Sequence, residues 1–116
     1  MIRMVKIVIL KTLVLEIKKK FNKSEANKIL NLMQSLENNP NKGKLLGSVG
    51  GIIIKELKYK NFRFYFLADG YKLKYLDKKE FVDLLLKFVR MSDKKHQQKA
   101  INEIKTILLK IGFEDF

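Results

Sequence analysis

The sequence predicts an α+β domain, in which an N-terminal strand and a helical hairpin pack on a small antiparallel sheet and a helix follows at the C-terminal end. Residues 52–67 form the densest block of β-branched and aromatic residues, which favours strands. Apolar residues recur at helical spacing before and after that block. Strands grouped after a helical hairpin are typical of an antiparallel sheet with its helices on one face. The length of 116 residues fits a single domain, residues 1–116.

The first third of the chain predicts one strand and two helices. Met4–Leu10 is a short apolar run rich in β-branched residues and indicates the first strand. An amphipathic helix is expected to follow up to about Phe21. Ser24 is expected to cap a second helix that ends by Asn38, because Pro40 disfavours helix in the residue before it. The apolar stripes are Leu10, Val14, Ile17 and Phe21 in the first helix, and Ala26, Ile29, Leu30, Met33 and Leu36 in the second.

The middle of the chain predicts a loop followed by strands. We expect, in order, a turn-rich loop at residues 39–44, a flexible connection at 45–51, antiparallel strands at 52–60 and 62–67, a hairpin turn at 68–70, and a further strand at Tyr71–Tyr75. A polar tip at residues 77–80 is expected to lead into a buried strand at Phe81–Val89. A short helix is the alternative there, because Leu is not a strong strand former.

The last helix has the most regular apolar spacing in the chain. We expect Ser92 or Asp93 to cap it, Gly112 to end it, and Phe113–Phe116 to form a tail. Its apolar stripe is Ala100, Ile101, Ile104, Ile107, Leu108 and Ile111.

The charge balance restricts what the protein contacts. The chain has 25 Lys and Arg against 12 Asp and Glu, a formal charge of +13. This excess predicts attraction to phosphates, to an acidic membrane surface or to an acidic protein partner. Residues 1–10 are too short to cross a membrane and too interrupted by charge for a signal peptide, so neither is expected. Of the three anionic partners, the membrane is therefore the one that we do not expect.

Several kinds of chemistry lack the residues they need. The chain has no cysteine, which excludes disulfides, zinc–thiolate sites and thiol catalysis and fits a cytoplasmic protein. Its carboxylates are sparse and scattered, and His96 is the single histidine, so neither paired-acid hydrolysis nor a metal site is supported. We therefore expect no metal and no cofactor.

Two groups of basic residues are the candidate site. The first group lies on the central strands and the second at the start of the last helix, and a loop before the strands adds two further cations. The first group is Lys55, Lys58, Lys60 and Arg63, and the second is Arg90, Lys94, Lys95 and His96. The two cations of the loop are Lys42 and Lys44. A helix start beside a sheet favours a phosphate through its backbone N–H groups. Each Lys taken singly is more often a solvated residue of its strand.

Arg63 is the most notable cation because the chain has only three arginines, at positions 3, 63 and 90. A bidentate contact to phosphate or carboxylate is one interpretation, and a structural salt bridge to Glu56 is the alternative. His96 is either a single proton donor or acceptor or a plain surface residue. RNA cleavage by the neighbouring 2′-hydroxyl needs charge stabilisation and proton transfer but no metal, and a Lys-rich site can supply both.

Several of these stretches together resemble the RelE/ParE toxin superfamily of toxin–antitoxin systems, in its RelE and HigB-like branch. The matching pieces, in chain order, are the first strand and helical hairpin; Asn39-Pro40 with Gly43-Lys44-Leu45-Leu46; Lys55-Glu56-Leu57-Lys58; Phe62-Arg63-Phe64-Tyr65-Phe66; and Phe88-Val89-Arg90-Met91-Ser92-Asp93-Lys94-Lys95 before a helix. The chain departs from the family pattern at Met91, where a second basic residue is expected, and in lacking a C-terminal tyrosine.

The resemblance implies a toxin that inhibits translation as a metal-free mRNA interferase, an endoribonuclease acting on mRNA in the ribosome. Its implied partners are the ribosome with mRNA and an acidic or partly disordered antitoxin. By matched position, Arg63 would contact or stabilise the scissile phosphate, and His96, at a nearby position, would substitute for the missing acid–base group. The implied catalytic residues are Arg63, Lys58, Lys55, Arg90 and His96, and the implied RNA-binding residues are Lys42, Lys44, Lys60, Lys94 and Lys95. The alternatives are a ParE-like toxin that binds DNA gyrase and a catalytically weak RNA-binding relative.

Overall fold

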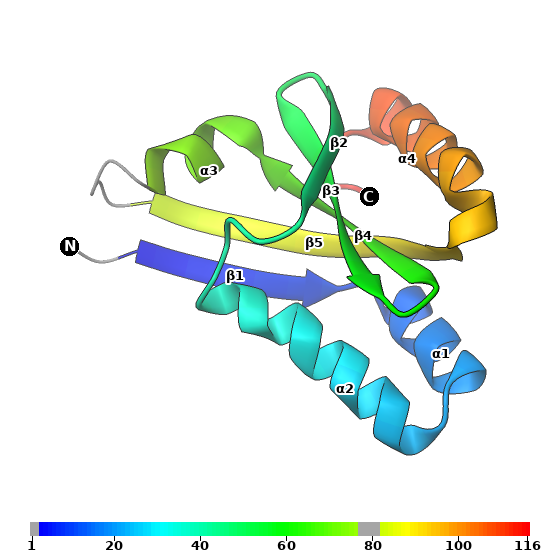
Figure 1. The fold of residues 1–116 in the computed structure, drawn as a ribbon. Coiled ribbons are helices and arrows are strands. Elements are labelled where there is room, and N and C mark those ends of the chain that lie inside the picture. The colour runs from blue at the N-terminus through cyan, green and yellow to red at the C-terminus, as the bar shows by residue number, and fades with distance from the viewer. Residues whose placement is uncertain (1–2, 77–81) are drawn as a thin grey trace.

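A five-stranded sheet forms the centre of the molecule, seen in a computed structural model that describes residues 3–76 and 82–116 (Figure 1). The strands are β1 (Arg3–Ile9), β2 (Lys44–Val49), β3 (Ile52–Tyr59), β4 (Phe62–Asp69) and β5 (Val82–Asp93). They lie in the order β1-β5-β4-β3-β2. The polar tip predicted at residues 77–80 and the first residue of the strand predicted from Phe81 lie outside the described residues.

The sheet is mixed, so the prediction of an antiparallel sheet is wrong at one pair of strands. β1 pairs with β5 in parallel, from Arg3 opposite Val82 to Ile9 opposite Phe88. The other three pairs are antiparallel. The parallel pair joins strands from opposite ends of the chain, and the apolar pattern of a strand carries no information about such a distant partner.

One face of the sheet, here called the hairpin face, is covered by α1 (Lys11–Lys20) and α2 (Lys23–Gln34) (Figure 1). A short 3₁₀ helix, η1 (Ser35–Glu37), extends α2. The predicted stripes supply the buried residues Ile17, Ala26, Ile29, Met33 and Leu36, whereas Leu13, which lies outside the predicted stripe of the first helix, is buried in place of Val14. They pack on Leu57, Phe64, Phe66 and Phe88 of the sheet. The first two helices therefore lie where the periodicity predicts, although Asn22 caps α2 in place of Ser24, its side chain accepting from the Glu25 amide at 2.8 Å.

The opposite face, here called the α4 face, is covered by α4 (Gln97–Ile111) (Figure 1). Its apolar contacts join Ile54, Tyr65, Leu67 and Val89 to Ala100, Ile101, Ile104 and Leu108. Helices thus cover both faces, and the prediction of helices on one face is wrong. A sheet whose central strand is apolar at nearly every position, as β4 is from Phe64 to Ala68, must be covered on both sides.

Two segments of the middle differ from their predicted states. Lys44–Val49 is strand β2, and the expected flexible connection is reduced to the turn at Gly50 and Gly51, which both have positive φ. Tyr71–Tyr75 belongs to the helix α3 (Gly70–Tyr75) and is not a strand. Asp69 is not a hairpin residue but the N-cap of α3, because its carboxylate accepts from the backbone N–H groups of Tyr71 and Lys72.

The end of the chain follows the prediction except at the start of α4, whose N-cap is His96 and not Ser92 or Asp93. β5 is longer than predicted and ends at Asp93, whose side chain caps the 3₁₀ turn η3 (Lys94–His96) before α4. Gly112 ends α4 at a φ of 78°. The tail packs against the α4 face through Phe113 and Phe116, and the buried amine of Lys87 donates to the carbonyl oxygens of Phe113 (2.8 Å) and Glu114 (3.3 Å).

Candidate functional site

The register of the central strands gathers polar residues on the α4 face near the start of β4. Lys58, Arg63 and Ser92 are opposite one another in one row across three strands. Glu56, Tyr65 and Arg90 form the next row. Residues opposite one another in a sheet project from the same face, so these six share a surface beside the N-terminal end of α4.

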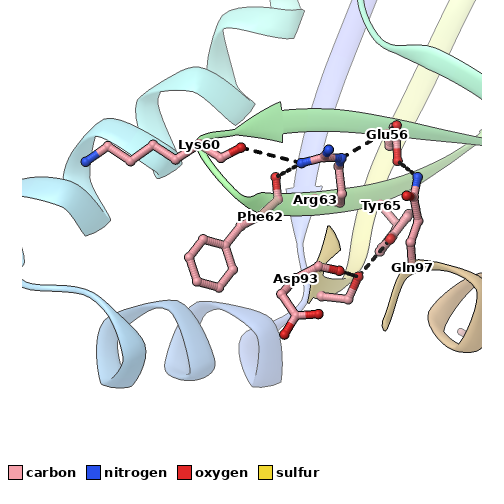
Figure 2. A network of polar contacts seen from close by, with 8 residues as sticks. Glu56, Lys60, Phe62, Arg63, Tyr65, Asp93 and Gln97 are labelled. Carbon is pink, nitrogen blue, oxygen red and sulfur yellow. Dashed lines mark hydrogen bonds and ion pairs between the residues drawn. The ribbon is translucent and has the colours of Figure 1, made fainter. Parts of the chain in front are cut away.

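Arg63 lies at the centre of this surface but is only 7% exposed. Its Nη1 donates to the carbonyl oxygens of Phe62 (3.2 Å) and Lys60 (3.5 Å) at the β3–β4 turn. Its Nε lies 4.0 Å from Glu56 Oε1, and the other oxygen of Glu56 accepts from Gln97 Nε2 at 2.8 Å (Figure 2). The salt bridge to Glu56, the structural alternative for this arginine, is therefore present. The guanidinium is held in place, and a nearby carboxylate offsets part of its charge.

A second chain of hydrogen bonds fixes the side of the surface formed by β5. Ser92 Oγ donates to the carbonyl of Asp93 at 2.9 Å, so its oxygen accepts from the Tyr65 hydroxyl at 2.8 Å (Figure 2). Burial raises the pKa of Tyr65, which keeps this hydroxyl neutral as a donor. Tyr65 is fully buried and is part of the core, not a platform for a base.

His96 lies on η3, beyond the end of β5, and its side chain contacts Asp93, which is opposite Phe62 of the hairpin face. Its Nδ1 lies 2.7 Å from Asp93 Oδ1, and its backbone N–H donates to the same oxygen at 2.9 Å. The hydrogen bond from the His96 side chain, assisted by the one from its backbone, holds the pKa of Asp93 below its ordinary value. An imidazole oriented by a carboxylate, with 57% of its side chain exposed, is open to solvent and to a ligand. Lys94 and Lys95 are exposed beside it.

Arg90 reaches the α4 face because β5 carries a bulge. Tyr65 is opposite Arg90 while Phe66 is opposite Phe88, so Val89 is an extra residue in β5. Val89 and Arg90 therefore both turn toward α4, where Arg90 forms an ion pair with Glu103. This pair directs Arg90 along the flank of α4.

Three of the other candidate lysines lie apart from this surface or along its edge. Lys60 extends from the turn toward α2, 3.4 Å from Glu25 Oε1 (Figure 2). Lys42 and Lys44 are exposed and line a groove with Lys58 at the edge of β3.

Lys55 lies on the hairpin face, opposite Phe66, and is separated by the sheet from Lys58 and Arg63. The structure thus brings Lys58 and Arg63 together in one row, and it sets Lys55 and Lys60 aside. Lys94, Lys95 and His96 follow the end of β5, where the backbone N–H of Lys94 donates to the carbonyl of Asn61 in the β3–β4 turn.

Sequence reasoning missed one member of the network. Gln97 carries no signal of its own, because a neutral amide at a helix start is ordinary. Glu56, the structural partner that the sequence offered for Arg63, is two residues before Lys58 on the same strand, and this spacing places both on one face of the sheet. Among residues 3–76 and 82–116, no group of three or more His, Cys, Asp or Glu could hold a metal ion. No helix in these ranges is both long and apolar enough to span a membrane.

Comparison with known proteins gives one structural match. No protein-family model and no curated protein matches the sequence. The chain is similar to a chain of the crystal structure of the archaeal RelE–RelB complex from Pyrococcus horikoshii OT3, with a TM-score of 0.57 and 14% identity. The match covers 78% of this chain and 96% of that chain. This likeness shows a RelE-like fold and confirms the fold that the resemblance in sequence implies.

Proposed function

We propose that this chain is the toxin of a type II toxin–antitoxin pair and inhibits translation by cleaving mRNA on the ribosome. The observation that carries the proposal is that Lys58 and Arg63 share one row on a surface of a RelE-like fold, and that the strand next to them, β5, leads directly into the exposed residues Lys94, Lys95 and His96. Such a surface attracts an RNA backbone and offers a proton-transfer group beside it.

The chemistry of such a cleavage can be assigned to the exposed groups. The 2′-oxygen attacks phosphorus and loses its proton, the bond from phosphorus to the 5′-oxygen breaks, and that oxygen gains a proton. The products are a 2′,3′-cyclic phosphate and a 5′-hydroxyl. The Lys58 ammonium would stabilise the extra negative charge of the phosphate, and the His96 imidazole would carry one of the two protons. Arg63 would support this region through the sheet and the turn.

One observation favours a second candidate, a catalytically weak RNA-binding relative. Arg63 is buried, its Nη1 donates to two carbonyls, and the Glu56 carboxylate stands beside it. A carboxylate near the scissile phosphate opposes the build-up of negative charge there. On this alternative the protein binds RNA through its lysines and cleaves it slowly or not at all.

The proposed partner is an antitoxin of acidic character. The similar solved structure is that of a RelE–RelB complex. A net charge of +13 favours a partner of opposite sign, which would cover the exposed lysines and block access of RNA. The proposed place of action is the cytoplasm, where ribosomes and mRNA meet.

The test is a translation extract containing ribosomes, programmed with one mRNA whose ends are mapped after the protein is added. Codon-phased cleavage that depends on ribosomes would support the nuclease. Intact mRNA together with RNA binding would support the weak relative. Intact mRNA with inhibited DNA supercoiling would point to the gyrase-binding class and would contradict the proposal.

Point variants connect the activity to the surface. Lys58→Ala and His96→Ala should each lower the rate of cleavage, by roughly tenfold or more. Both side chains are exposed, so the fold should survive. Lys110→Ala is the control, because it removes an exposed lysine from the far end of α4. Equal loss in all three variants would indicate a general charge effect and not a site.

A further inference from the structure

We propose that the groove between the start of β2 and the edge of β3 binds RNA phosphates that flank the reacting one, and that buried Lys55 positions this groove. The proposal rests on the proposed function, and it assigns Lys55 a positioning role in place of a catalytic one. Figure 1 shows the chain passing from the end of α2 into β2, the strand at the edge of the sheet next to β3.

Lys55 is buried on the hairpin face with 6% of its surface exposed. Its Nζ donates to the carbonyl oxygen of Asn41 at 3.0 Å and lies 5.8 Å from the centre of the Phe66 ring. Burial lowers the pKa of this amine. A buried ammonium needs compensation, and here a loop carbonyl and an aromatic face provide it. The side chain therefore fastens the loop to the sheet and is not presented to a ligand.

The same loop has a second attachment at Gly43. Its φ is +107°, and a Cβ built there would lie 2.9 Å from Phe66 Cζ and 3.1 Å from the Glu56 carbonyl oxygen. The backbone thus approaches the strand more closely than any other residue type allows. Attachments at residues 41 and 43 fix the backbone on both sides of Lys42 and just before Lys44.

The groove itself has a volume of about 350 Å³. Its cations are Lys42, Lys44 and Lys58, all exposed. The single acid in its lining, Glu56, already accepts from Gln97 and faces Arg63. Three ammonium groups therefore face solvent with little carboxylate available to them, which suits an anion with several charges.

The groove continues into the proposed site. Lys44 is opposite Glu56 and Lys58 is opposite Arg63, so the cations follow the edge of the sheet toward the row that contains Arg63. β2 pairs with β3 only as far as Glu56, which leaves the edge of β3 open beside Lys58. A polynucleotide backbone has the extended shape and regular charge that this path would contact.

An acidic protein segment is the other polyanion that this groove could hold, and the lining argues against it. Its apolar members are Leu32, which is half-buried, and Leu57, which is buried. Protein interfaces derive most of their affinity from apolar or aromatic anchors in pockets, and little apolar surface is open here. Phosphate contacts by lysine need no such anchor.

The test measures the affinity for a fluorescein-labelled oligouridylate by anisotropy at several salt concentrations. Lys42→Ala/Lys44→Ala should flatten the dependence of log K on log salt by about 0.7 for each lysine removed. Lys72→Ala/Lys110→Ala removes the same charge from two exposed positions elsewhere and should change the slope much less. Equal slopes in the two double variants would contradict the proposal that the groove binds RNA phosphates.

Lys55 is tested by Lys55→Met, which keeps the apolar stem and removes the donor, and by Lys55→Arg, which keeps a donor. Lys55→Met should weaken RNA binding by about fivefold, with faster amide exchange at residues 41–44, and Lys55→Arg should restore part of the affinity. In the Lys42→Ala/Lys44→Ala background, Lys55→Met should have no further effect on affinity. In the extract it should raise KM and leave kcat unchanged.

The outcomes separate this proposal from the proposed function. Undiminished RNA affinity in Lys55→Met, with wild-type cleavage of mRNA, overturns the positioning role and leaves the nuclease standing. A loss of affinity that persists in the Lys42→Ala/Lys44→Ala background also overturns it, because Lys55 would then act elsewhere. If polyglutamate displaces the labelled oligouridylate at a lower concentration of charge than unlabelled oligouridylate does, the proposal that RNA is the ligand of the groove is wrong. A wild-type protein that neither binds nor cleaves RNA refutes the proposed function itself.

Discussion

Removing Arg63 should destabilise the protein whether or not Arg63 takes part in cleavage. Arg63→Ala leaves the Glu56 carboxylate, itself 7% exposed, without its cation, and it frees the carbonyls of Phe62 and Lys60. Breaking a buried ion pair by removing one partner lowers stability by roughly 3–5 kcal/mol. Gln97 still donates to Glu56, and the two atoms of the pair are 4.0 Å apart, so we expect the lower end, about 3 kcal/mol.

A double-mutant cycle isolates the contribution of the pair. Glu56→Gln keeps the shape of the side chain and an oxygen that can accept from Gln97, but it leaves the buried guanidinium of Arg63 with only the two turn carbonyls as partners, so it should cost about 2 kcal/mol. The double variant has no unpaired carboxylate. Its loss of unfolding free energy should therefore be smaller than the sum of the losses in the two single variants, by about 1–2 kcal/mol. For a domain of this length, about 3 kcal/mol corresponds to a fall in Tm of roughly 12 °C.

The assay is urea denaturation followed by circular dichroism, with the free energy of unfolding extrapolated to water. Wild type, both single variants and the double variant are compared at one pH and one salt concentration. Additive losses, or a wild-type midpoint for Arg63→Ala, would refute the buried pair and would return Arg63 to the role of a free phosphate ligand.

Three further predictions concern other parts of the chain. Gly43→Ala should lower stability by about 2 kcal/mol or more because of its strained φ and crowded Cβ, and Gly50→Ala, where nothing lies within 4 Å, should lower it by about 1 kcal/mol; equal losses in urea unfolding would contradict the close approach. The lowered pKa of Asp93 stabilises the fold above the ordinary value of 3.8 and ceases to do so as pH falls through the lowered value. His96→Ala should therefore lower the unfolding midpoint near neutral pH, with the difference from wild type closing below 3.8; a difference that is constant with pH would exclude this coupling. Lys87→Met should lower stability by about 1–3 kcal/mol and speed amide exchange in the C-terminal tail, and unchanged exchange there would show that the tail does not depend on this lysine.

The parts of the fold that the sequence predicts well are those whose pattern is local and repeated. The helices after the first strand and the last helix have long apolar stripes, and they lie where these stripes predict. β2 was missed because Gly47 and Ser48 weaken its apolar pattern, and its stability comes from pairing with β3. Tyr71–Tyr75 alternates over too few residues to separate strand from helix, and the cap at Asp69 decides for helix.

The sequence predicts the parts of the candidate site that depend only on which face of the sheet a strand residue occupies, because side chains alternate between the two faces along a strand. Lys58 and Arg63 are opposite each other on adjacent strands, and both fall on the α4 face. Lys55 and Lys58 are three positions apart in one strand, and this odd spacing places them on opposite faces. The bond from Gln97 to Glu56 was beyond prediction, because it depends on where the start of α4 lies over the sheet.

These placements change how a loss of activity should be interpreted. Arg63 is the residue that the resemblance to RelE/ParE toxins singles out, yet its substitution disturbs a buried pair and two turn carbonyls. Loss of cleavage in Arg63→Ala would therefore follow from a disturbed site as readily as from a missing charge. Lys58→Ala changes an exposed residue in the same row, without a buried partner to orphan. Of the two variants, only Lys58→Ala can distinguish a nuclease from an RNA-binding relative by the ratio of its effects on kcat and on RNA affinity.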